Sequence, residues 1–456
     1  MIARALEPPP ASANAEGGLR DPARRRRITS ALLLGMAGLS LIFASAHAST
    51  DCPDLEATAD GPIFRDARPT ALVEGLPPGA FRTRLESCLT EPPRAGPRTI
   101  GHRGAPLRYP EHTRQSYLAA ARLGATTLEC DVTFTRDQEL VCRHDACDLH
   151  RTTNVLRTKL AESCSESFQP ALIEDGILTR LASARCCVSD FSREEFLSLE
   201  GRHDRINPTA GTVDDYLEAK AEEPTCLEHG TLVTHRESIS LFQSLGVGMA
   251  PELKAPGVEL PAHGKRLEDY ADELVQAYRD AGVPPGAVWL QSFDPDIVRH
   301  WLATAGEFAE RVVWLDGRYA LAGFDHRDSE RLATDFQAMV RLGLKQVAPP
   351  LWMLVEAGAD GIIPSRYGPL ARAAGLELIT WTLERSGDLA KGGGWYYQTL
   401  NGSNPLPGTS GGFRITRDAD QLLLARVLFE DIGVRAVFSD WPSTTALVDR
   451  CLSSED

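Results

Sequence analysis

The sequence predicts an α/β protein with the (β/α)8 architecture of a TIM barrel, and three observations support this class. From Thr99 onward, short apolar runs alternate with longer amphipathic helical patterns. The apolar runs do not alternate strictly with polar residues, which is typical of parallel strands covered by helices. About eight such units over roughly 350 residues fit a barrel better than an open, doubly wound sheet, which is the second choice.

The predicted elements follow one another along residues 99–452, which we assign to the barrel. Helices are expected at residues 113–125, 266–282, 296–306 and 369–375. Strands are expected at residues 99–103, 127–134, 139–145, 247–254, 287–293, 311–317, 358–364, 376–383 and 434–440.

Three segments fall outside this rhythm. Residues 49–98 are rich in Pro, Ala and Asp and predict an irregular N-terminal extension. Residues 146–240 are polar and Cys-rich, which predicts a long insertion after the strand that ends near His144. Residues 385–420 contain Gly, Asn and Pro around aromatic residues and predict a long loop. Both the insertion and the loop follow strands, on the face where barrel enzymes carry their sites.

The N-terminus has the parts of a secretory signal. Four arginines at 24–27 precede an apolar run that ends in the small residues Ala46 and Ala48. We therefore predict that residues 1–48 are a signal peptide and that the protein is exported to a periplasmic or extracellular space. The apolar run approaches the length of a spanning helix, so an uncleaved membrane anchor is the alternative.

The ten cysteines all lie beyond the predicted cleavage site. An even number of cysteines in an oxidising compartment favours disulfides, although the pairing does not follow from the sequence. Cys130 and Cys142 lie inside strand-like runs, so these two are also compatible with buried free thiols. The cysteine spacing does not match a zinc site.

The net charge of -15 argues against a nucleic-acid partner, because binding to phosphate backbones requires clustered Lys and Arg. An anionic small-molecule substrate would need cationic groups placed locally. The oligomeric state is left open.

Polar side chains gather at the C-terminal ends of the predicted strands. Two pairs, Glu129 with Asp131 and Glu252 with Lys254, are spaced i and i+2, so each pair projects from one face of its strand. The others at strand ends are His102, Arg103, His144, Asp145, Gln291 and Trp381.

These residue types point to phosphoryl transfer. Glu129, Asp131 and Glu252 offer the oxygen ligands that a single Ca²⁺ or Mg²⁺ prefers. Histidines beside such a cation suit proton transfer near neutral pH. Local cationic groups at Arg103 and Lys254 would hold phosphate oxygens.

Each of these residues also has a purely structural interpretation. Glu129 and Asp131 would also fit an acidic edge that caps a helix, and His144 would fit a satisfied structural histidine. Asp145 either takes a direct part in the chemistry or has a structural role, in which it orients His144 or caps a loop. Trp381 by itself would most often belong to a core. The joint placement of these groups at strand ends favours the site.

Eight motifs, in order over residues 99 to about 450, resemble those of the glycerophosphodiester phosphodiesterases. They are HRG (102–104), PEHT (110–113), E-x-D (129–131), T-x-D followed by LVCRHD (135–145), PELK (251–254), QSF (291–293), TWT (380–382) and SDWP (439–442).

The resemblance implies a metal-dependent barrel hydrolase that cleaves glycerophosphodiesters to sn-glycerol 3-phosphate and an alcohol, in phospholipid degradation and glycerol metabolism. It further implies that the substrate's own glycerol hydroxyl attacks phosphorus to give a cyclic phosphate. The implied roles are metal ligands for Glu129, Asp131 and Glu252, acid and base for His102 and His144, and substrate contacts for Arg103, Lys254, Glu111, Gln291 and Trp381.

The chain departs from many relatives at two motif positions, with His112 in place of Asn and Gln138 in place of Gly. Two rival functions remain. One is a lysophospholipase D whose aromatic segment 392–400 touches a membrane. The other is an inactive cell-surface binding protein on the same barrel.

Overall fold

The protein is described from a computed structural model. The structure describes residues 52, 53, 55, 63–219, 225–260, 262, 264–385, 387, 389–402 and 413–453. The predicted signal peptide therefore lies outside the described residues, as do residues 403–412 of the predicted long loop. Within the described ranges, no helix is both long and apolar enough to cross a membrane.

The predicted TIM barrel is confirmed. In the described chain, eight parallel strands form a sheet in the order β1-β17-β16-β13-β12-β11-β10-β2, and pairing of β2 with β1 closes it. These strands are β1 (Gly96–Gly101), β2 (Ala125–Phe134), β10 (Gly248–Leu253), β11 (Leu290–Ser292), β12 (Val312–Leu315), β13 (Gln346–Ala348), β16 (Glu377–Leu383) and β17 (Ala436–Ser439).

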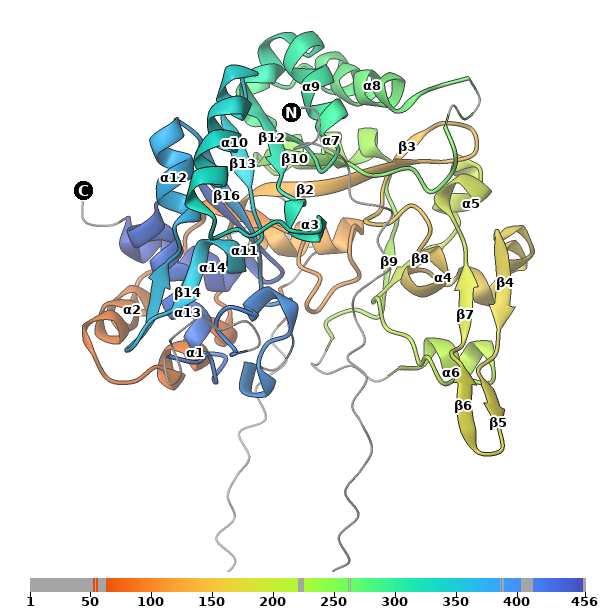
Figure 1. Cartoon of the computed structure of the whole chain (residues 1–456). Coiled ribbons are helices and arrows are strands. Elements are labelled where there is room, and N and C mark those ends of the chain that lie inside the picture. The colour runs from red at the N-terminus through yellow and green to blue at the C-terminus, as the bar shows by residue number, and fades with distance from the viewer. Residues whose placement is uncertain are drawn as a thin grey trace, which may run out of the picture.

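Helices lie between successive strands and cover the outside of the barrel (Figure 1). In α8, for example, Tyr270, Leu274 and Tyr278 recur every four residues and are buried, so one face packs on the sheet. The covering helices are α3 (Arg114–Arg122), α7 (His235–Ser244), α8 (Leu267–Asp280), α9 (Pro295–Thr304), α10 (Ser329–Arg341), α12 (Tyr367–Ala374), α13 (Asp420–Arg426) and α14 (Pro442–Leu452).

The barrel interior is filled by its own apolar cluster, to which most strands contribute. Its members are Ile100, Ala250, Val313, Leu315, Ala348, Ile379, Ala436 and Phe438. Because side chains alternate along a strand, the residue two positions after an inward core residue also points inward. By this rule, the inward positions beyond the packed core, toward the C-terminal ends of the strands, can be identified from the sequence.

Two runs predicted as strands do form strands, but the prediction that they belong to the parallel barrel is wrong. The run that ends near His144 forms β3 (Leu140–Cys142), which pairs antiparallel with the end of β2 and is not a barrel strand. The run at 358–364 contributes β15 (Ile362–Pro364) to a hairpin with β14 (Val355–Ala357). The barrel strand in this part is β13, which was missed because it has only three residues between Lys345 and Pro349.

The N-terminal extension is more regular than its composition predicts. It contains α1 (Ala67–Gly75) and α2 (Ala80–Thr90), and both contact α14. The Asp66 carboxylate caps α1 and also accepts hydrogen bonds from Trp441 Nε1 and Ser443 Oγ, each at 2.5 Å. This distant contact, which the local sequence pattern does not reveal, orders the segment.

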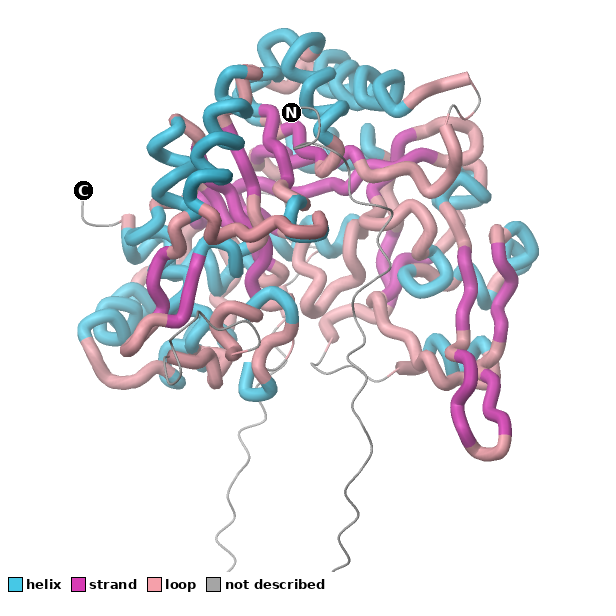
Figure 2. Tube along the Cα trace, in the orientation of Figure 1, coloured by secondary structure: helices cyan, strands magenta, loops and turns pink. Residues whose placement is uncertain are grey.

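The predicted insertion forms a lobe beside the barrel (Figures 1 and 2). It has its own buried core, which includes Leu149, Phe191, Phe196 and Tyr216. Its elements are α4 (Leu149–Thr152), β4 (Glu166–Gln169), β5 (Leu172–Glu174), β6 (Ile177–Arg180), β7 (Ser183–Arg185), α5 (Arg193–Leu197), β8 (Glu200–Arg202), α6 (Val213–Leu217) and β9 (His229–Thr231).

All ten cysteines are paired, as the even count predicts. The alternative that Cys130 and Cys142 are free thiols is wrong, because their sulfurs are bonded at 2.08 Å. The disulfides are Cys52–Cys226, Cys88–Cys451, Cys130–Cys142, Cys147–Cys187 and Cys164–Cys186.

Candidate active site

Three carboxylates meet inside the mouth of the barrel. Asp131 on β2 lies directly beside Glu252 on the neighbouring strand β10, and Glu129 lies one inward position below. Each of the three offers one oxygen within 4.8 Å of the others. All three are buried, so the i and i+2 spacing read from the sequence does bring them together.

The electrostatics of the cluster show that it carries excess negative charge. Burial, followed by repulsion from Asp131 and Glu252, raises the pKa of Glu129 well above its ordinary value. Burial raises the pKa of Glu252 to about 8, with Asp131 adding to the rise and Lys254 opposing it. Burial also opposes ionisation of Asp131, but Lys254, His112 and Arg103 together lower its pKa. The cluster would gain from a further positive charge.

The cluster fits a hard divalent cation. Asp131 Oδ1 is buried and has no hydrogen-bond partner, which leaves a carboxylate oxygen free to act as a ligand. Its other oxygen accepts a 2.8 Å hydrogen bond from His112 Nε2, and His112 Nδ1 lies 2.8 Å from the Tyr117 hydroxyl. His112, whose role the sequence left open, therefore orients Asp131.

A second group, Glu111, His144 and Asp148, also has ligand atoms within 4.8 Å of one another. It does not suit a cation, because arginines surround Glu111. The Glu111 carboxylate lies 2.9 Å from Arg103 Nη1 and 3.5 Å from a nitrogen of Arg143 and of Arg385. The candidate metal ligands are therefore the three carboxylates of the first cluster.

His102 is held by a carboxylate. Ile100 points into the barrel core, and His102 follows two residues later, just after β1. Its Nδ1 lies 2.5 Å from Asp440 Oδ1, so Nδ1 donates to the carboxylate and Nε2 is left as an acceptor. Burial lowers the pKa of His102 to about 4 although Asp440 opposes the shift, and the ring is therefore neutral near pH 7.

His144 lies in the segment that leaves β3 for the insertion, and one of its ring nitrogens is within 4.8 Å of carboxylate oxygens of Glu111 and Asp148. Burial, with the positive charges of Arg103 and Lys254, lowers its pKa well below the ordinary value. The Asp145 carboxylate accepts a 2.7 Å hydrogen bond from the backbone N–H of Cys147. Asp145 therefore caps this loop in the structure.

The predicted phosphate contacts lie beside the carboxylate cluster. The backbone N–H of Arg103 donates to Glu129 at 2.9 Å, and its guanidinium is fixed by Glu111. Lys254 Nζ lies 2.6 Å from Glu252 Oε1. Gln291 Nε2 donates to Glu129 Oε1 at 3.1 Å, so this residue orients a carboxylate and need not touch a substrate.

Trp381 forms part of an aromatic wall. It follows the inward residue Ile379 by two positions, and its indole N–H donates to the Ala348 carbonyl at 2.9 Å. Trp395 stacks on it at 5.9 Å between ring centroids, and Tyr396 meets both rings edge-on. Trp381, Trp395 and Tyr396 are each partly exposed.

Two site residues escaped the sequence analysis. Asp440 belongs to the SDWP motif and follows the inward Phe438 by two positions, so the alternation rule would have found it. Arg385 Nη1 donates to Asp440 at 3.2 Å, and its other terminal nitrogen faces Glu111. No local pattern marks Arg385, because it lies in a loop just after β16.

Comparison with known proteins places this geometry in a family. The model of the glycerophosphoryl diester phosphodiesterase family matches residues 102–444. The chain therefore belongs to this family, and the predicted resemblance is confirmed.

Individual relatives differ in how much they cover. An Arthroderma benhamiae protein named "Extracellular protein" is 33% identical over 259 residues, which are 55% of this chain and 99% of that protein. A glycerophosphodiester phosphodiesterase of Haemophilus influenzae is 29% identical over 203 residues, 43% of this chain and 49% of its own length.

A solved structure supports the fold alone. It comes from a Silicibacter pomeroyi protein whose name places it among the glycerophosphoryl diester phosphodiesterases. The TM-score is 0.50 at 17% identity, with coverage of 79% of this chain and 95% of that chain.

Proposed function

We propose that the chain hydrolyses glycerophosphodiesters to sn-glycerol 3-phosphate and an alcohol, with a divalent cation, Ca²⁺ or Mg²⁺, as cofactor. The observation that carries the proposal is the meeting of a buried three-carboxylate cluster with His102 at one barrel mouth. His102 Nε2 lies 3.9 Å from Glu129 Oε2, so a group held by the carboxylates would lie beside the imidazole.

Glu129, Asp131 and Glu252 would hold the cation. When bound, it supplies Lewis-acid stabilisation of charge on the phosphoryl group. Arg103 and Lys254 bring the local positive charge that an acidic chain otherwise lacks, and they lie against this cluster. The same set of residues disfavours an inactive binding protein, because simple binding does not need a histidine fixed by a buried carboxylate.

The histidines move protons in this proposal. The neutral His102 accepts a proton at Nε2 from the glycerol hydroxyl while its oxygen bonds to phosphorus. The bond from phosphorus to the leaving alcohol breaks, and His144 donates a proton to that oxygen. Burial lowers the pKa of His144, and the positive charges of Arg103 and Lys254 lower it further. A bound phosphodiester anion offsets those charges, which favours the protonated form of His144. Water then opens the cyclic phosphate.

The test is release of sn-glycerol 3-phosphate from glycerophosphocholine by the purified protein. We expect release that stops on treatment with a chelator and returns with Ca²⁺ or Mg²⁺. No release with either metal, from protein whose disulfides are intact, would contradict the proposal.

A lysophospholipase D is the second candidate, and the partly exposed aromatic layer favours it. Trp381, Trp395 and Tyr396 present half-buried rings next to the site, where a lipid chain would pack. Parallel assays on glycerophosphocholine and lysophosphatidylcholine separate the candidates. Faster turnover of the lysolipid would favour the second.

Export is part of the proposal. Five disulfides in the described chain fit an oxidising compartment, and a relative is named an extracellular protein. We expect mature protein from its source to begin after Ala48 and to contain no free thiols, as measured by mass spectrometry. A retained leader would favour the membrane anchor instead.

A further inference from the structure

His144 lies on a segment outside the eight barrel strands. It follows β3, which pairs with β2 through three residue pairs, and the N–H of the preceding Arg143 donates to the Asp131 carbonyl at 2.7 Å. The chain then leaves for the insertion, which rejoins the covering helices of the barrel at α7. A catalytic group on such a segment needs additional anchoring, because a displacement of about 1 Å can cost roughly 10²-fold in rate.

Two disulfides bracket this histidine in sequence. Two residues before it, Cys142 is bonded to Cys130, which lies between Glu129 and Asp131 on the outward face of β2. Three residues after it, Cys147 is bonded to Cys187. The first bond ties the start of the segment to the strand that carries the carboxylates.

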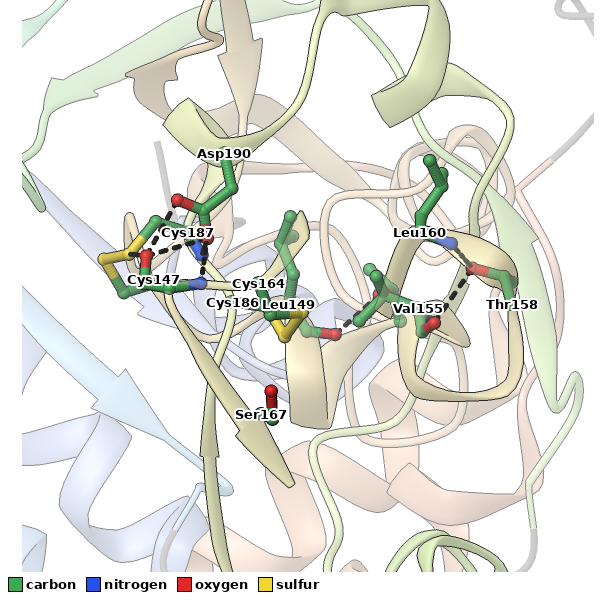
Figure 3. Close-up of a disulfide and its surroundings, with 12 residues drawn as sticks. Cys147, Leu149, Val155, Thr158, Leu160, Cys164, Ser167, Cys186, Cys187 and Asp190 are labelled. Carbon is green, nitrogen blue, oxygen red and sulfur yellow. Dashed lines mark hydrogen bonds between the residues drawn. A yellow bond between two sulfur atoms is a disulfide. The ribbon is translucent and has the colours of Figure 1, made fainter. Parts of the chain in front are cut away.

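The second bond ties the end of the segment to the insertion core and to the barrel. Figure 3 shows the disulfide Cys147–Cys187 next to Cys164–Cys186. The Asp190 carboxylate accepts a 2.7 Å hydrogen bond from the backbone N–H of Cys187. The adjacent backbone is fixed as well, because the N–H of Val188 donates to the Ala146 carbonyl at 2.7 Å.

The same disulfide packs on the loop that follows β10, the strand of Glu252. Cys147 Sγ lies 3.6 Å from the carbonyl oxygen of Gly257. A Cβ atom at residue 257 would clash with this sulfur and would lie 2.9 Å from Ala146 Cβ. Only glycine permits this approach. The segment that holds His144 is therefore pressed against the loop that begins at Lys254.

We propose that the Cys147–Cys187 disulfide is a positioning element for His144, so that full activity requires the oxidised insertion. The inference rests on the proposed function. The disulfide itself does not touch the reacting atoms, and it acts by holding the 143–149 segment against the Gly257 loop.

The experiment is a double-mutant cycle between the disulfide and the histidine. With the full-length protein, C147A/C187A should lower kcat for glycerophosphocholine about 10- to 100-fold, with a smaller change in KM. In the His144→Ala background, the same pair should cost less than about 3-fold, because the group that it positions is gone. A loss of equal size in both backgrounds would overturn the inference.

The matched control is C88A/C451A, which removes a disulfide between α2 and α14 away from the site. Its kcat should stay within about 2-fold of the wild type. Gly257→Ala is a second probe that leaves all cysteines intact. It should lower kcat in the wild-type background and have little effect with His144→Ala.

A measurement without substrate separates this inference from the proposed function. In hydrogen exchange followed by mass spectrometry, C147A/C187A should speed exchange at residues 143–149 and leave β2 unchanged. Unchanged exchange in this segment would overturn the inference whatever the activity. An inactive wild-type protein that shows the expected exchange would contradict only the proposed function.

Discussion

The two histidines of the candidate site are supported in different ways. His102 lies at the end of a barrel strand and is fixed by one hydrogen bond to Asp440, itself at the end of the neighbouring strand. His144 lies outside the barrel, on a segment anchored by disulfides and an insertion. The barrel places the first by strand geometry, whereas the second lies between two disulfides, one to strand β2 and one within the insertion.

This difference explains why the sequence predicts the surroundings of His102 better than those of His144. On the barrel side, the positions of the site residues follow from the alternation of side chains along a strand. His102, Trp381 and Asp440 each come two residues after an inward apolar residue. On the insertion side, the position of His144 depends on cysteine pairing, and Cys147 and Cys187 are 40 residues apart. The local sequence does not encode such a pairing.

The largest expected effect comes from the carboxylate cluster between the two histidines' supporting segments. Glu129→Gln and Glu252→Gln should each lower kcat about 10⁴-fold, because loss of a metal ligand removes several kcal/mol of charge stabilisation. Calorimetry should show weaker binding of Ca²⁺ or Mg²⁺, and circular dichroism should show the fold intact. Unchanged metal dependence in either variant would show that the substituted carboxylate is not a metal ligand.

The histidines themselves come next. His102→Ala and His144→Ala should each lower kcat about 10²- to 10⁴-fold with less effect on KM, since the lost proton transfer belongs to the transition state. A nitrophenyl leaving group scarcely needs protonation, so the variant that lacks the acid should recover on that substrate. We expect this recovery for His144→Ala. Recovery of His102→Ala instead would reverse the two roles.

A smaller effect is expected from substitution of Asp440, the carboxylate that holds His102. Asp440→Asn keeps the side-chain shape but removes the charge that fixes the His102 tautomer, so kcat should fall about 10²-fold. The loss should be absent in the His102→Ala background. If Asp440→Asn were as active as the wild type, strand geometry alone would suffice to place His102.

The fold was predictable where local pattern decides it, and less so where distant contacts do. The barrel class followed from the repeated strand and helix patterns, but β13 was too short to detect, and the antiparallel pairing of β3 depends on its partner. The helix α1 was missed for a related reason. It is tied down through Asp66 to Trp441, more than 370 residues away.

The same limit applies to the site. The i and i+2 spacing predicted the carboxylate cluster, because strand geometry converts spacing into a shared face. Arg385 could not be predicted, since a loop residue finds its partners, Asp440 and Glu111, only in the folded chain.

The smallest effect concerns another buried histidine, His235, which lies outside the candidate site and so tests whether burial alone keeps a histidine neutral. His235 in α7 is fully buried, and its Nε2 lies 3.0 Å from the Tyr278 hydroxyl. Burial, assisted by Arg236, lowers its pKa to about 3. Between this value and the ordinary 6.5, the unfolded chain binds the proton and the folded chain does not, so stability falls as the pH drops through that window.

From pH 7.5 to 4.5 this one histidine should cost about 3 kcal/mol of unfolding free energy. In urea unfolding at both pH values, His235→Gln should therefore lose less stability on acidification than the wild type, by about that amount. His229→Gln, at a half-exposed histidine in the insertion, is the control. An equal acid loss in wild type and His235→Gln would show that His235 is protonated in the folded protein. Burial alone would then not keep a histidine neutral in this fold, and the neutral His102 would have to be attributed to the charges around it.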